Sequence, residues 1–353
     1  RRVRGARTGL RRTPRVNRRD SASEAPVPAH GRRKGPRGAG RRRGDLASFA
    51  GAAAADAAMS QVQLAGPPTD GISALSFAPT SDLLLASSWD TGVRLYDARA
   101  NTGPKTTYHH RAAVLDCALA DDTTAYSGGL DQAVTAYDTA TETMTSLGEH
   151  DDAVRCVAHS RDLGAVVTAG WDSTMRVWDP RASDALQHTA ALPGKAYTMD
   201  VGGDGQHLVV VGTADRHVVL FDTRRLPEAS ETRESSLKFQ TRCIRLFPDG
   251  EGFAVSSIEG RVAIEFVSAE DQKRKYAFKC HRAKVGDVEH VFPVNALAFH
   301  PSFGTFATGG CDGLVNVWDA RAKKRLCRLP KLRVGVAALE FNRDGSPLAL
   351  PGR

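Results

Sequence analysis

The sequence has no apolar run long enough to cross a membrane. No stretch of about 18 consecutive apolar residues occurs in the 353 residues, which excludes a membrane-spanning helix. Three common enzyme motifs, G-x-x-x-x-G-K-[ST], G-x-S-x-G and H-E-x-x-H, are also missing. Only six cysteines occur, and none form a C-x-x-C pair, so the sequence predicts neither a zinc site nor a disulfide framework. We therefore expect no enzymatic activity, no cofactor and no metal.

The charge is distributed unevenly along the chain. Residues 1–58 hold 16 of the 48 Lys and Arg residues and 4 of the 40 Asp and Glu residues, a net charge of +12. Residues 59–353 therefore hold 32 basic and 36 acidic residues, a net charge of −4. A mildly acidic domain argues against general nucleic-acid binding by the folded part. Only 7% of the residues are aromatic, so the core must rely on Val, Leu and Ala.

Residues 1–58 form an arm rich in Arg, Gly, Ala and Pro. Such a segment buries too little apolar surface to offset chain entropy, so we expect it to be disordered. Residue 1 is Arg, and Met59 opens the first domain-like segment, which favours a non-native extension. A nuclear-localisation or RNA-contacting arm and an organellar transit peptide are the alternatives. The folded domain is expected over residues 59–353.

From Gly71 onward the sequence repeats one pattern: small residues, a turn acid, and an alternating apolar strand that closes on an aromatic residue and Asp. Clear copies run from Ser87 to Asp97 and from Thr168 to Asp179. A period of about 40–45 residues with a terminal Trp-Asp is typical of four-stranded propeller blades, and the repeats resemble those of the WD-repeat family. The turn acids are Asp90, Asp131, Asp172, Asp215, Glu259 and Asp312, at steps of 41, 41, 43, 44 and 53 residues.

Three repeats also carry His, Ser or Thr, Asp and an aromatic residue at matching offsets. Repetition in three blades favours a buried hydrogen-bond network that stabilises each blade over a single catalytic triad. In the WD-repeat family, which these blades resemble, that network is a structural tetrad. The three sets are His110, Ser127, Asp131 and Tyr137; His150, Thr168, Asp172 and Trp178; and His290, Thr308, Asp312 and Trp318.

A seventh repeat is only partly present. Residues 336–341 are expected to form its inner strand, followed by a turn at Asp344 and Gly345 and a further strand at 348–350. Its outer strand could come only from Gln61–Leu64. The sequence therefore predicts an all-β, seven-bladed WD-repeat β-propeller whose last blade is incomplete and leaves exposed strand edges.

Several stretches resemble one WD-repeat family in particular, the mitotic (spindle assembly) checkpoint propellers of the Bub family. A sister family, the messenger-RNA export propellers that dock on a nucleoporin, shares D-G-I-S, S-I-E-G-R-V-A and F-K-C-H-R with this sequence. Ser88–Thr91, Leu95–Asp97 and Lys238–Cys243 are more similar to the checkpoint family. The stretches that carry the resemblance are Pro67–Ser73, Ser87–Thr91, Ala113–Cys117, Arg233–Arg245, Ser256–Ala263 and Lys275–Arg282.

This resemblance implies a non-enzymatic adaptor of the spindle assembly checkpoint. Members of the family bind the GLEBS motifs of Bub-type checkpoint kinases and phosphorylated MELT motifs of a kinetochore scaffold. The resemblance also implies a protein of the nucleus and cytoplasm, at kinetochores in mitosis, that is a monomer within heteromeric complexes. Neither membrane contact nor direct nucleic-acid binding by the propeller is expected.

Trp89 and Trp171 are candidate partner-binding residues because each precedes a turn acid, where an indole on a rim is unusual. Packing on a neighbouring turn is the alternative. Lys238, Arg242 and Arg261 are expected near the same rim, and arginine pairs bidentately with carboxylate or phosphate groups. An acidic or phosphorylated peptide is the partner that fits such a rim.

A basic run in the same repeat is the last candidate: Lys273, Arg274 and Lys275. The resemblance implies that this region meets the phosphothreonine peptide, and a solvated charge run is the alternative. Two other functions stay open for the whole chain, messenger-RNA export at the nuclear pore and substrate recognition in a ubiquitin ligase. Binding to checkpoint-kinase or nucleoporin GLEBS peptides separates the first two, and co-purification with a ligase adaptor would favour the third.

Overall fold

A computed structural model of the chain describes residues 62–346, 348 and 349. All of the described residues belong to one compact unit. The expected arm at residues 1–58 therefore lies outside the described residues. In the described part, no helix is both long and apolar enough to cross a bilayer.

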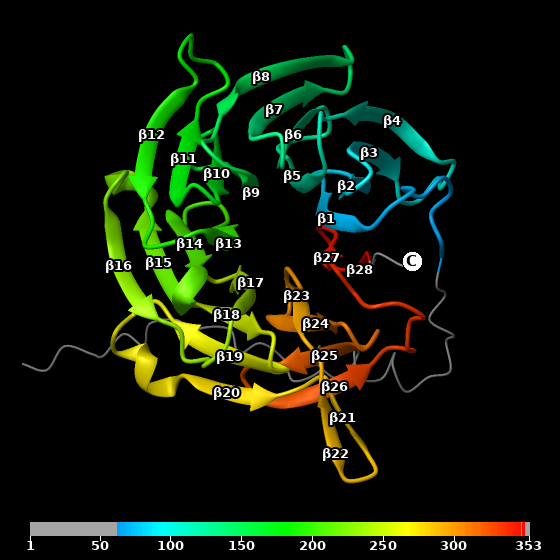
Figure 1. The fold of residues 1–353 in the computed structure, drawn as a ribbon, viewed down its shortest axis with the longest axis vertical. Helices are drawn as coiled ribbons and strands as arrows, with labels where there is room; N and C mark the ends of the chain where they lie inside the picture. The colour runs from blue at the N-terminus through cyan, green and yellow to red at the C-terminus, as the bar shows by residue number, and fades with distance from the viewer. Residues whose placement is uncertain (1–61, 347, 350–353) are drawn as a thin grey trace, which may run out of the picture. The chain divides into compact units, whose positions relative to one another are not determined.

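Six four-stranded antiparallel sheets follow one another along the described chain, and each is a simple meander (Figure 1). We number them blades 1 to 6. They are β1–β4 (Ile72–Phe77, Leu83–Ser88, Gly92–Asp97, Pro104–His109), β5–β8 (Val114–Leu119, Thr124–Gly129, Ala133–Asp138, Thr143–Glu149), β9–β12 (Val154–Ser160, Ala165–Gly170, Thr174–Trp178, Leu186–Ala191), β13–β16 (Ala196–Val201, Leu208–Thr213, His217–Asp222, Ala229–Glu234), β17–β20 (Thr241–Leu246, Gly252–Ser257, Arg261–Phe266, Tyr276–Lys279) and β23–β26 (Val294–Phe299, Thr305–Gly310, Val315–Asp319, Lys324–Arg328).

Smaller elements join or follow these blades. A hairpin, β21 (Arg282–Val285) and β22 (Val288–Val291), projects between blades 5 and 6 (Figure 1). A two-stranded sheet, β27 (Glu340–Phe341) and β28 (Leu348–Ala349), follows blade 6. The described helical segments are 3-10 turns: η1 (Ala214–Arg216), η2 (Thr223–Arg225) and η3 (Asp271–Arg274). The expectation of an all-β propeller is thus confirmed with six four-stranded blades in the described residues, whereas the seventh blade stays a prediction, since β27 and β28 form only a two-stranded sheet.

Burial within each blade follows from its position between two neighbours. The second strands β10, β18 and β24 are buried at every residue, whereas the outer strands β12 and β16 are mostly exposed. One apolar cluster joins Val167 and Met175 of blade 3 to Val211 and Phe221 of blade 4. Each sheet is covered on both faces by its neighbouring blades. Both faces of its central strands are therefore apolar, and these strands are continuously rather than alternately hydrophobic.

The turn acids shape the tight turn between the second and third strands. Asp90, Asp172 and Asp312 each accept a hydrogen bond from the backbone N–H two residues later, at 3.0–3.1 Å. The residue that follows the turn acid adopts a positive φ in all six blades, and only two of the six are glycines. The acid side chain therefore stabilises a left-handed backbone conformation that is elsewhere adopted mostly by glycine.

Neighbouring inner strands run side by side in the same direction. Ser76 of β1 accepts from the N–H of Leu119 in β5 at 3.1 Å, and Asp116 of β5 accepts from that of Val157 in β9 at 2.8 Å. Because these strands share one direction, they all begin at one edge of the sheets, which we name the start rim. The turns between second and third strands and the links between blades also lie there. The turns between first and second and between third and fourth strands lie at the opposite rim.

β27 connects the last complete blade to the first, since it contacts both β23 and β1. Arg343 donates to the carbonyl oxygen of Thr80 in blade 1. The expectation that Gln61–Leu64 forms the outer strand of this last sheet does not hold for the described residues. The carbonyl oxygen of Gln63 accepts a hydrogen bond from Asn101 of blade 1 at 3.0 Å, and Val62–Leu64 form no strand.

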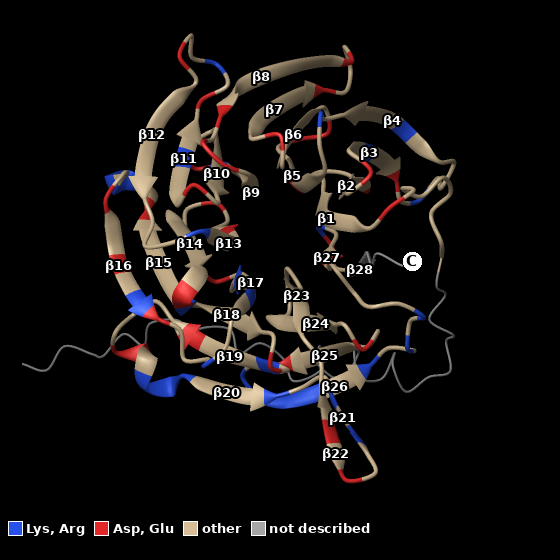
Figure 2. Cartoon of the chain, in the orientation of Figure 1, with Lys and Arg blue, Asp and Glu red and all other residues tan. Residues whose placement is uncertain are grey.

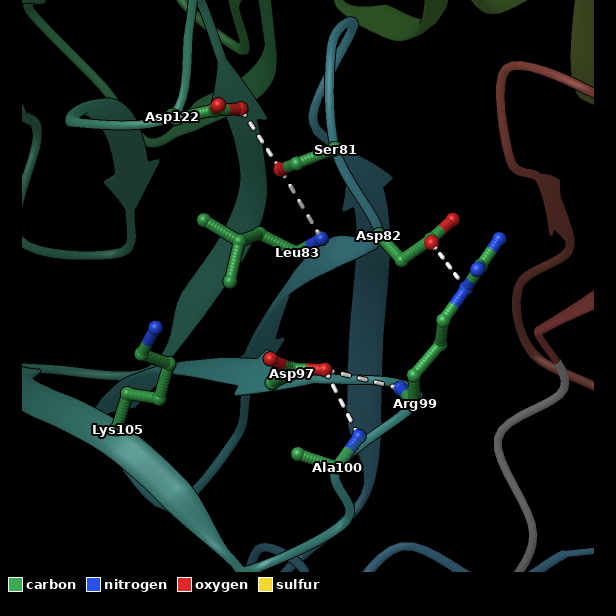
Figure 3. A pocket seen from close by; sticks show the side chains of 8 residues that line it. All are labelled: Ser81, Asp82, Leu83, Asp97, Arg99, Ala100, Lys105 and Asp122. Atoms are coloured by element: carbon green, nitrogen blue, oxygen red, sulfur yellow. Dashed lines mark hydrogen bonds and ion pairs between the residues drawn. The ribbon is translucent and has the colours of Figure 1, made fainter.

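A hollow of about 550 Å³ lies at the opposite rim of blade 1 (Figure 3). Asp82 pairs with Arg99, and Asp97 accepts from the backbone N–H groups of Arg99 and Ala100. Asp122 accepts from the Ser81 hydroxyl at 2.7 Å. All three carboxylates in this hollow thus have partners within the blades. We therefore assign the hollow a structural role.

Candidate functional site

A hydrogen-bonded network in blade 3 joins the four predicted side chains. His150 Nδ1 lies 2.9 Å from Asp172 Oδ2, and His150 Nε2 lies 2.8 Å from Thr168 Oγ1. Trp178 Nε1 donates to the same hydroxyl at 2.8 Å. His150 follows the outer strand of blade 2, so this network ties two blades together. Burial lowers the pKa of His150, which favours its neutral form.

The predicted blade 6 network contains the wrong histidine. His281, and not His290, lies 2.9 Å from Asp312 and 2.8 Å from Thr308, while Trp318 donates to Thr308 at 3.0 Å. His290 is exposed on β22. The β21–β22 hairpin is inserted between His281 and the inner strand, so the separation from Thr308 grows from the expected 18 residues to 27. The sequence prediction assumed a fixed spacing within the repeat and therefore chose His290, which lies on the inserted hairpin.

Blade 2 differs from the prediction in its aromatic member. His110 lies 2.8 Å from Ser127 and 3.0 Å from Asp131, as expected, but Ser127 is bonded to the Tyr108 hydroxyl at 2.9 Å. Tyr137 instead stacks on Tyr108, with ring centroids 4.2 Å apart. The Tyr137 hydroxyl is bonded to the Thr106 hydroxyl at 3.0 Å, so its polar atom is engaged away from Ser127. Tyr108 of the neighbouring blade bonds the serine in its place.

The carboxylates of these networks are held ionised. Burial alone would raise the pKa of Asp172, but His150 and hydrogen bonds from Thr174 and the Asp151 N–H outweigh it and lower the pKa below its ordinary value. Burial would also raise the pKa of Asp312, but His281 and backbone hydrogen bonds together outweigh it and lower that pKa as well. A buried, ionised Asp beside a hydrogen-bonded His makes a rigid network whose oxygens are already occupied. These side chains are therefore structural and hold the turns of the start rim in place.

One position of the start rim is repeated in all six blades, directly before the turn acid. Its backbone N–H donates to the carbonyl oxygen just before the inner strand, at 2.8–3.1 Å in every blade. The backbone is thus occupied and only the side chain is available to a partner. None of the six side chains is charged: they are Trp89, Leu130, Trp171, Ala214, Ile258 and Cys311. We name this set the rim positions.

The two predicted tryptophans differ in their surroundings. Trp89 is 50% exposed, and Leu130 is 37% exposed. Trp171 is half-buried, and Lys195 Nζ lies 5.6 Å from its ring centroid. The Trp171 Nε1 group is buried, and among the described residues it has no hydrogen-bond acceptor. An unsatisfied indole N–H costs free energy until an acceptor reaches it.

A cavity of about 60 Å³ lies where the inner strands converge, and Arg155, Arg242 and Asn295 line it. Arg242 is exposed, and its guanidinium donates to Asn295 Oδ1 at 3.1 and 3.3 Å. Within the described residues no carboxylate pairs with Arg242. It is therefore a guanidinium at the rim whose charge is open to an acidic ligand.

Asp116, Arg155 and Arg245 also line this cavity and belong to a cluster of partly buried charged groups. Burial raises the pKa of Asp116 and of Asp200, although Arg155 and Arg245 oppose it. Burial also raises the pKa of Glu340 to about 7. Burial alone would lower the pKa of Arg245, but the surrounding anionic groups raise it instead. Asp116, Asp200 and Glu340 thus share Arg245 as a cationic neighbour that opposes the rise in their pKa values.

The predicted basic residues of blade 5 lie at two different rims. Arg261 pairs in register with Ser257 and Lys279, and Ser257 pairs with Thr241, the neighbour of Arg242. Arg261 and Arg242 therefore lie at the start rim, with Lys238 in the link that precedes them. Lys273, Arg274 and Lys275 form the connection from β19 to β20 and lie at the opposite rim. The antiparallel meander separates groups that are close in sequence.

The pairing of these basic side chains also differs. Arg261 lies 3.5 Å from Glu259, and Arg274 lies 2.8 Å from Asp271 and over the Phe266 ring. Lys238, Lys273 and Lys275 are exposed. The start rim also holds a side chain that sequence reasoning missed, Phe239, which is 51% exposed. A large ring in a polar link between two blades was the signal that could have identified it.

Comparison with known proteins gives one family model and several relatives. The model described as WD domain, G-beta repeat matches residues 60–97, 141–179 and 273–319. The mitotic checkpoint protein BUB3.1 of Arabidopsis thaliana is 48% identical over 294 residues, covering 82% of this chain and 85% of that protein. The mitotic checkpoint protein bub-3 of Caenorhabditis elegans is 41% identical, covering 83% and 88%.

A relative with a different function is more distant. The mRNA export factor GLE2 of Chaetomium thermophilum is 38% identical over 298 residues, covering 82% of both chains. All three relatives cover a similar share of this chain, 82–83%. The higher identity of these two checkpoint proteins agrees with the resemblance at Lys238–Cys243.

Proposed function

This chain belongs to the BUB3 family of WD-repeat mitotic checkpoint proteins, and from that premise we propose that it is a non-enzymatic adaptor of the spindle assembly checkpoint. It holds the GLEBS segment of a checkpoint kinase on the start rim. It acts in the nucleus and, during mitosis, at kinetochores.

The observation that carries this proposal is the composition of the start rim. Six rim positions with occupied backbone groups expose uncharged side chains, including the half-exposed Trp89. An apolar peptide face that covers these positions buries them from water, at a gain of roughly 25 cal/mol per Å². Tryptophan and arginine are the residue types that most often dominate such binding.

Arg242 supplies the charge selectivity in this proposal. Its guanidinium is exposed and its bonds go to a neutral amide oxygen, so a peptide carboxylate would gain a charge-assisted pair without displacing an existing one. Arg261 and Lys238 extend the same positive region along the rim. Arg261 contributes less, because Glu259 already neutralises part of its charge.

The phosphorylated MELT repeat occupies the opposite rim of blade 5 in this proposal. Lys273 and Lys275 are exposed beside Arg274, and a phosphothreonine carries about −1.5 to −2 charges near neutral pH. Two rims allow one molecule to hold a kinase peptide and a scaffold peptide at once. An adaptor needs that simultaneous occupancy.

Titration with two GLEBS peptides tests the proposal. We expect the full chain to bind a checkpoint-kinase GLEBS peptide more tightly than a nucleoporin GLEBS peptide. The export function is the second candidate, because export proteins are also relatives at 37–38% identity. Tighter binding of the nucleoporin peptide would reverse the assignment, and binding of neither peptide would overturn both.

A further inference from the structure

Two basic segments that are far apart in the sequence meet on the outer wall of blades 5 and 6. The Tyr276 hydroxyl of β20 donates to the Ala320 carbonyl oxygen at 2.5 Å, and Lys323 Nζ lies 4.6 Å from the Tyr276 ring centroid. Figure 2 shows Lys and Arg (blue) gathered along β20 and β26. We name as the basic belt these exposed side chains: Lys273, Lys275, Lys279, Lys323, Lys324, Arg325 and Arg328.

The belt is not neutralised within the described chain. None of its seven cations forms an ion pair with a described carboxylate, and three nearby acids have other partners. Asp271 pairs with Arg274 at 2.8 Å, Asp249 pairs with Arg321 at 3.1 Å, and Asp319 accepts from the Ala322 N–H at 2.8 Å. Like charges on two adjoining outer strands repel one another, and a polyanion removes that repulsion.

The number of unpaired cations indicates the kind of polyanion. One phosphothreonine, with at most about two negative charges, needs about two of the seven side chains. A nucleic acid carries a negative charge at every nucleotide and can use all of them. The belt also offers little to bases, because Lys323 covers the half-buried Tyr276 ring and no exposed aromatic ring lies among the belt residues. Contacts would therefore go to the phosphate backbone.

The path of the belt distinguishes a single strand from a duplex. Lys279 lies at the start-rim end of β20, whereas Lys273 and Lys275 lie at the other end. The cations thus run along the wall of two separate blades, where a flexible strand can follow them. A duplex with a persistence length of about 150 base pairs cannot bend around this wall without cost.

We propose that the basic belt binds the phosphate backbone of a single-stranded nucleic acid without sequence preference. This activity goes beyond the proposed adaptor function and differs from the expectation drawn from the mean charge. The net charge of −4 over residues 59–353 averages the belt with acids that lie on other blades. Residues 1–58, with a net charge of +12, also attract nucleic acid, so the test must change the belt within the full chain.

Fluorescence anisotropy with a labelled 20-nucleotide oligouridylate is the measurement. The belt variant is Lys323→Glu, Lys324→Glu, Arg325→Glu. A control with the same change in net charge is Lys105→Glu, Arg161→Glu, Arg225→Glu, at exposed positions outside the belt. We expect the belt variant to bind at least about 10-fold more weakly, and its slope of log K against log salt to flatten by about 2, since each single-strand contact contributes about 0.7. The control should change less than about 3-fold.

Three outcomes would overturn the proposal. Unchanged binding by the belt variant would assign the affinity to residues 1–58. Equal weakening of the belt variant and the control would show that only net charge matters. Loss of phosphorylated MELT binding with unchanged oligouridylate binding would make the belt a peptide surface. Kinase-peptide binding at the start rim, measured on the same variants, reports separately on the proposed function, and a thermal melt verifies that each variant folds.

Discussion

The side-chain amide of Asn342 donates a 2.9 Å hydrogen bond to a carboxylate oxygen of Asp82, across 260 residues of sequence. Asn342 follows β27, and Asp82 precedes β2 of blade 1. Asp82 also pairs with Arg99, so one carboxylate joins the last inner strand to the first blade. Asn342 is 1% exposed, which makes this bond a buried link.

Asn342→Ala should therefore destabilise the propeller. Removing one partner of a buried hydrogen bond costs about 1–3 kcal/mol, because the other partner stays desolvated. Chemical denaturation measures the loss. The exposed pair of Arg161 and Asp204 is the matched control, and Arg161→Ala should cost less than about 1 kcal/mol. Equal effects of the two variants would show that β27 does not close the described ring.

His281→Ala should destabilise the protein far more than His290→Ala. His281 is 4% exposed and bonds both Asp312 and Thr308, so its removal strands two buried groups and should cost about 2–4 kcal/mol. His290 is exposed on the hairpin, and its replacement should change stability by less than about 0.5 kcal/mol. Thermal melts of both variants decide between the two histidines. The reverse order would restore the offset-based assignment of His290.

Stability should fall as pH rises from 6 to 8, and Glu340 should be one cause. Its pKa is raised from 4.5 to about 7 by burial, with Asp116 of β5, Asp200 of β13 and Arg245 of β17 as charged neighbours. A folded pKa above the unfolded value means that the contribution is complete below about pH 4.5 and lost as pH rises through about 7.

Glu340→Gln provides the comparison, because the amide keeps the shape of the protonated acid. We expect the melting temperature of the parent to fall between pH 6 and 8 by at least about 2 °C more than that of the variant. Identical pH profiles would show that Glu340 is ionised throughout, with its pKa near the ordinary range.

Trp89→Ala should weaken binding of the checkpoint-kinase GLEBS peptide without lowering the melting temperature. Truncating a hot-spot side chain typically costs about 2 kcal/mol or more, which is about 30-fold in Kd. Trp171→Ala should act in the same direction. Phe303, an exposed ring between β23 and β24 at the opposite rim, is the control, and Phe303→Ala should leave Kd unchanged. If the Trp89 variant melts early and binds normally once folded, the indole is a packing residue.

Charge changes at the two rims of blade 5 should act on different peptides. Arg242→Ala should weaken the acidic GLEBS peptide by about 10-fold or more, since its carboxylate would lose a charge-assisted partner. Lys273→Glu with Arg274→Glu should instead abolish the preference for phosphorylated MELT peptide. Because Arg274 also pairs with Asp271, Lys273→Glu with Lys275→Glu serves as the second variant.

Titrations of both peptides against all of these variants check the separation. Higher salt should reduce phosphopeptide binding more strongly, because that contact depends on charge alone, whereas binding at the start rim also buries the apolar rim positions. If either rim's variants weaken both peptides equally, the two sites are not independent. Retained phospho-preference in both charge-reversed proteins would exclude this part of blade 5 as the reader.

The repeat in the sequence was sufficient to predict the blades and their turns. The six turn acids lie between second and third strands, where a short acid side chain can accept the backbone N–H two residues on. These are local interactions within a few residues, so the spacing of Asp and of apolar residues carries the information. The blade 3 set around His150 follows the same logic, because no insertion interrupts it.

Only the tertiary structure decided which groups from different blades meet. An inserted hairpin places His281 where the sequence predicted His290. Tyr108 of the neighbouring blade bonds Ser127 in place of Tyr137, whose hydroxyl bonds Thr106. The antiparallel meander placed Arg242 and Lys273 of one blade at opposite rims, and contact between β20 and the turn before β26 assembled the basic belt. Sequence spacing reports on one chain segment, whereas burial and net charge at a site depend on side chains that folding brings together from several.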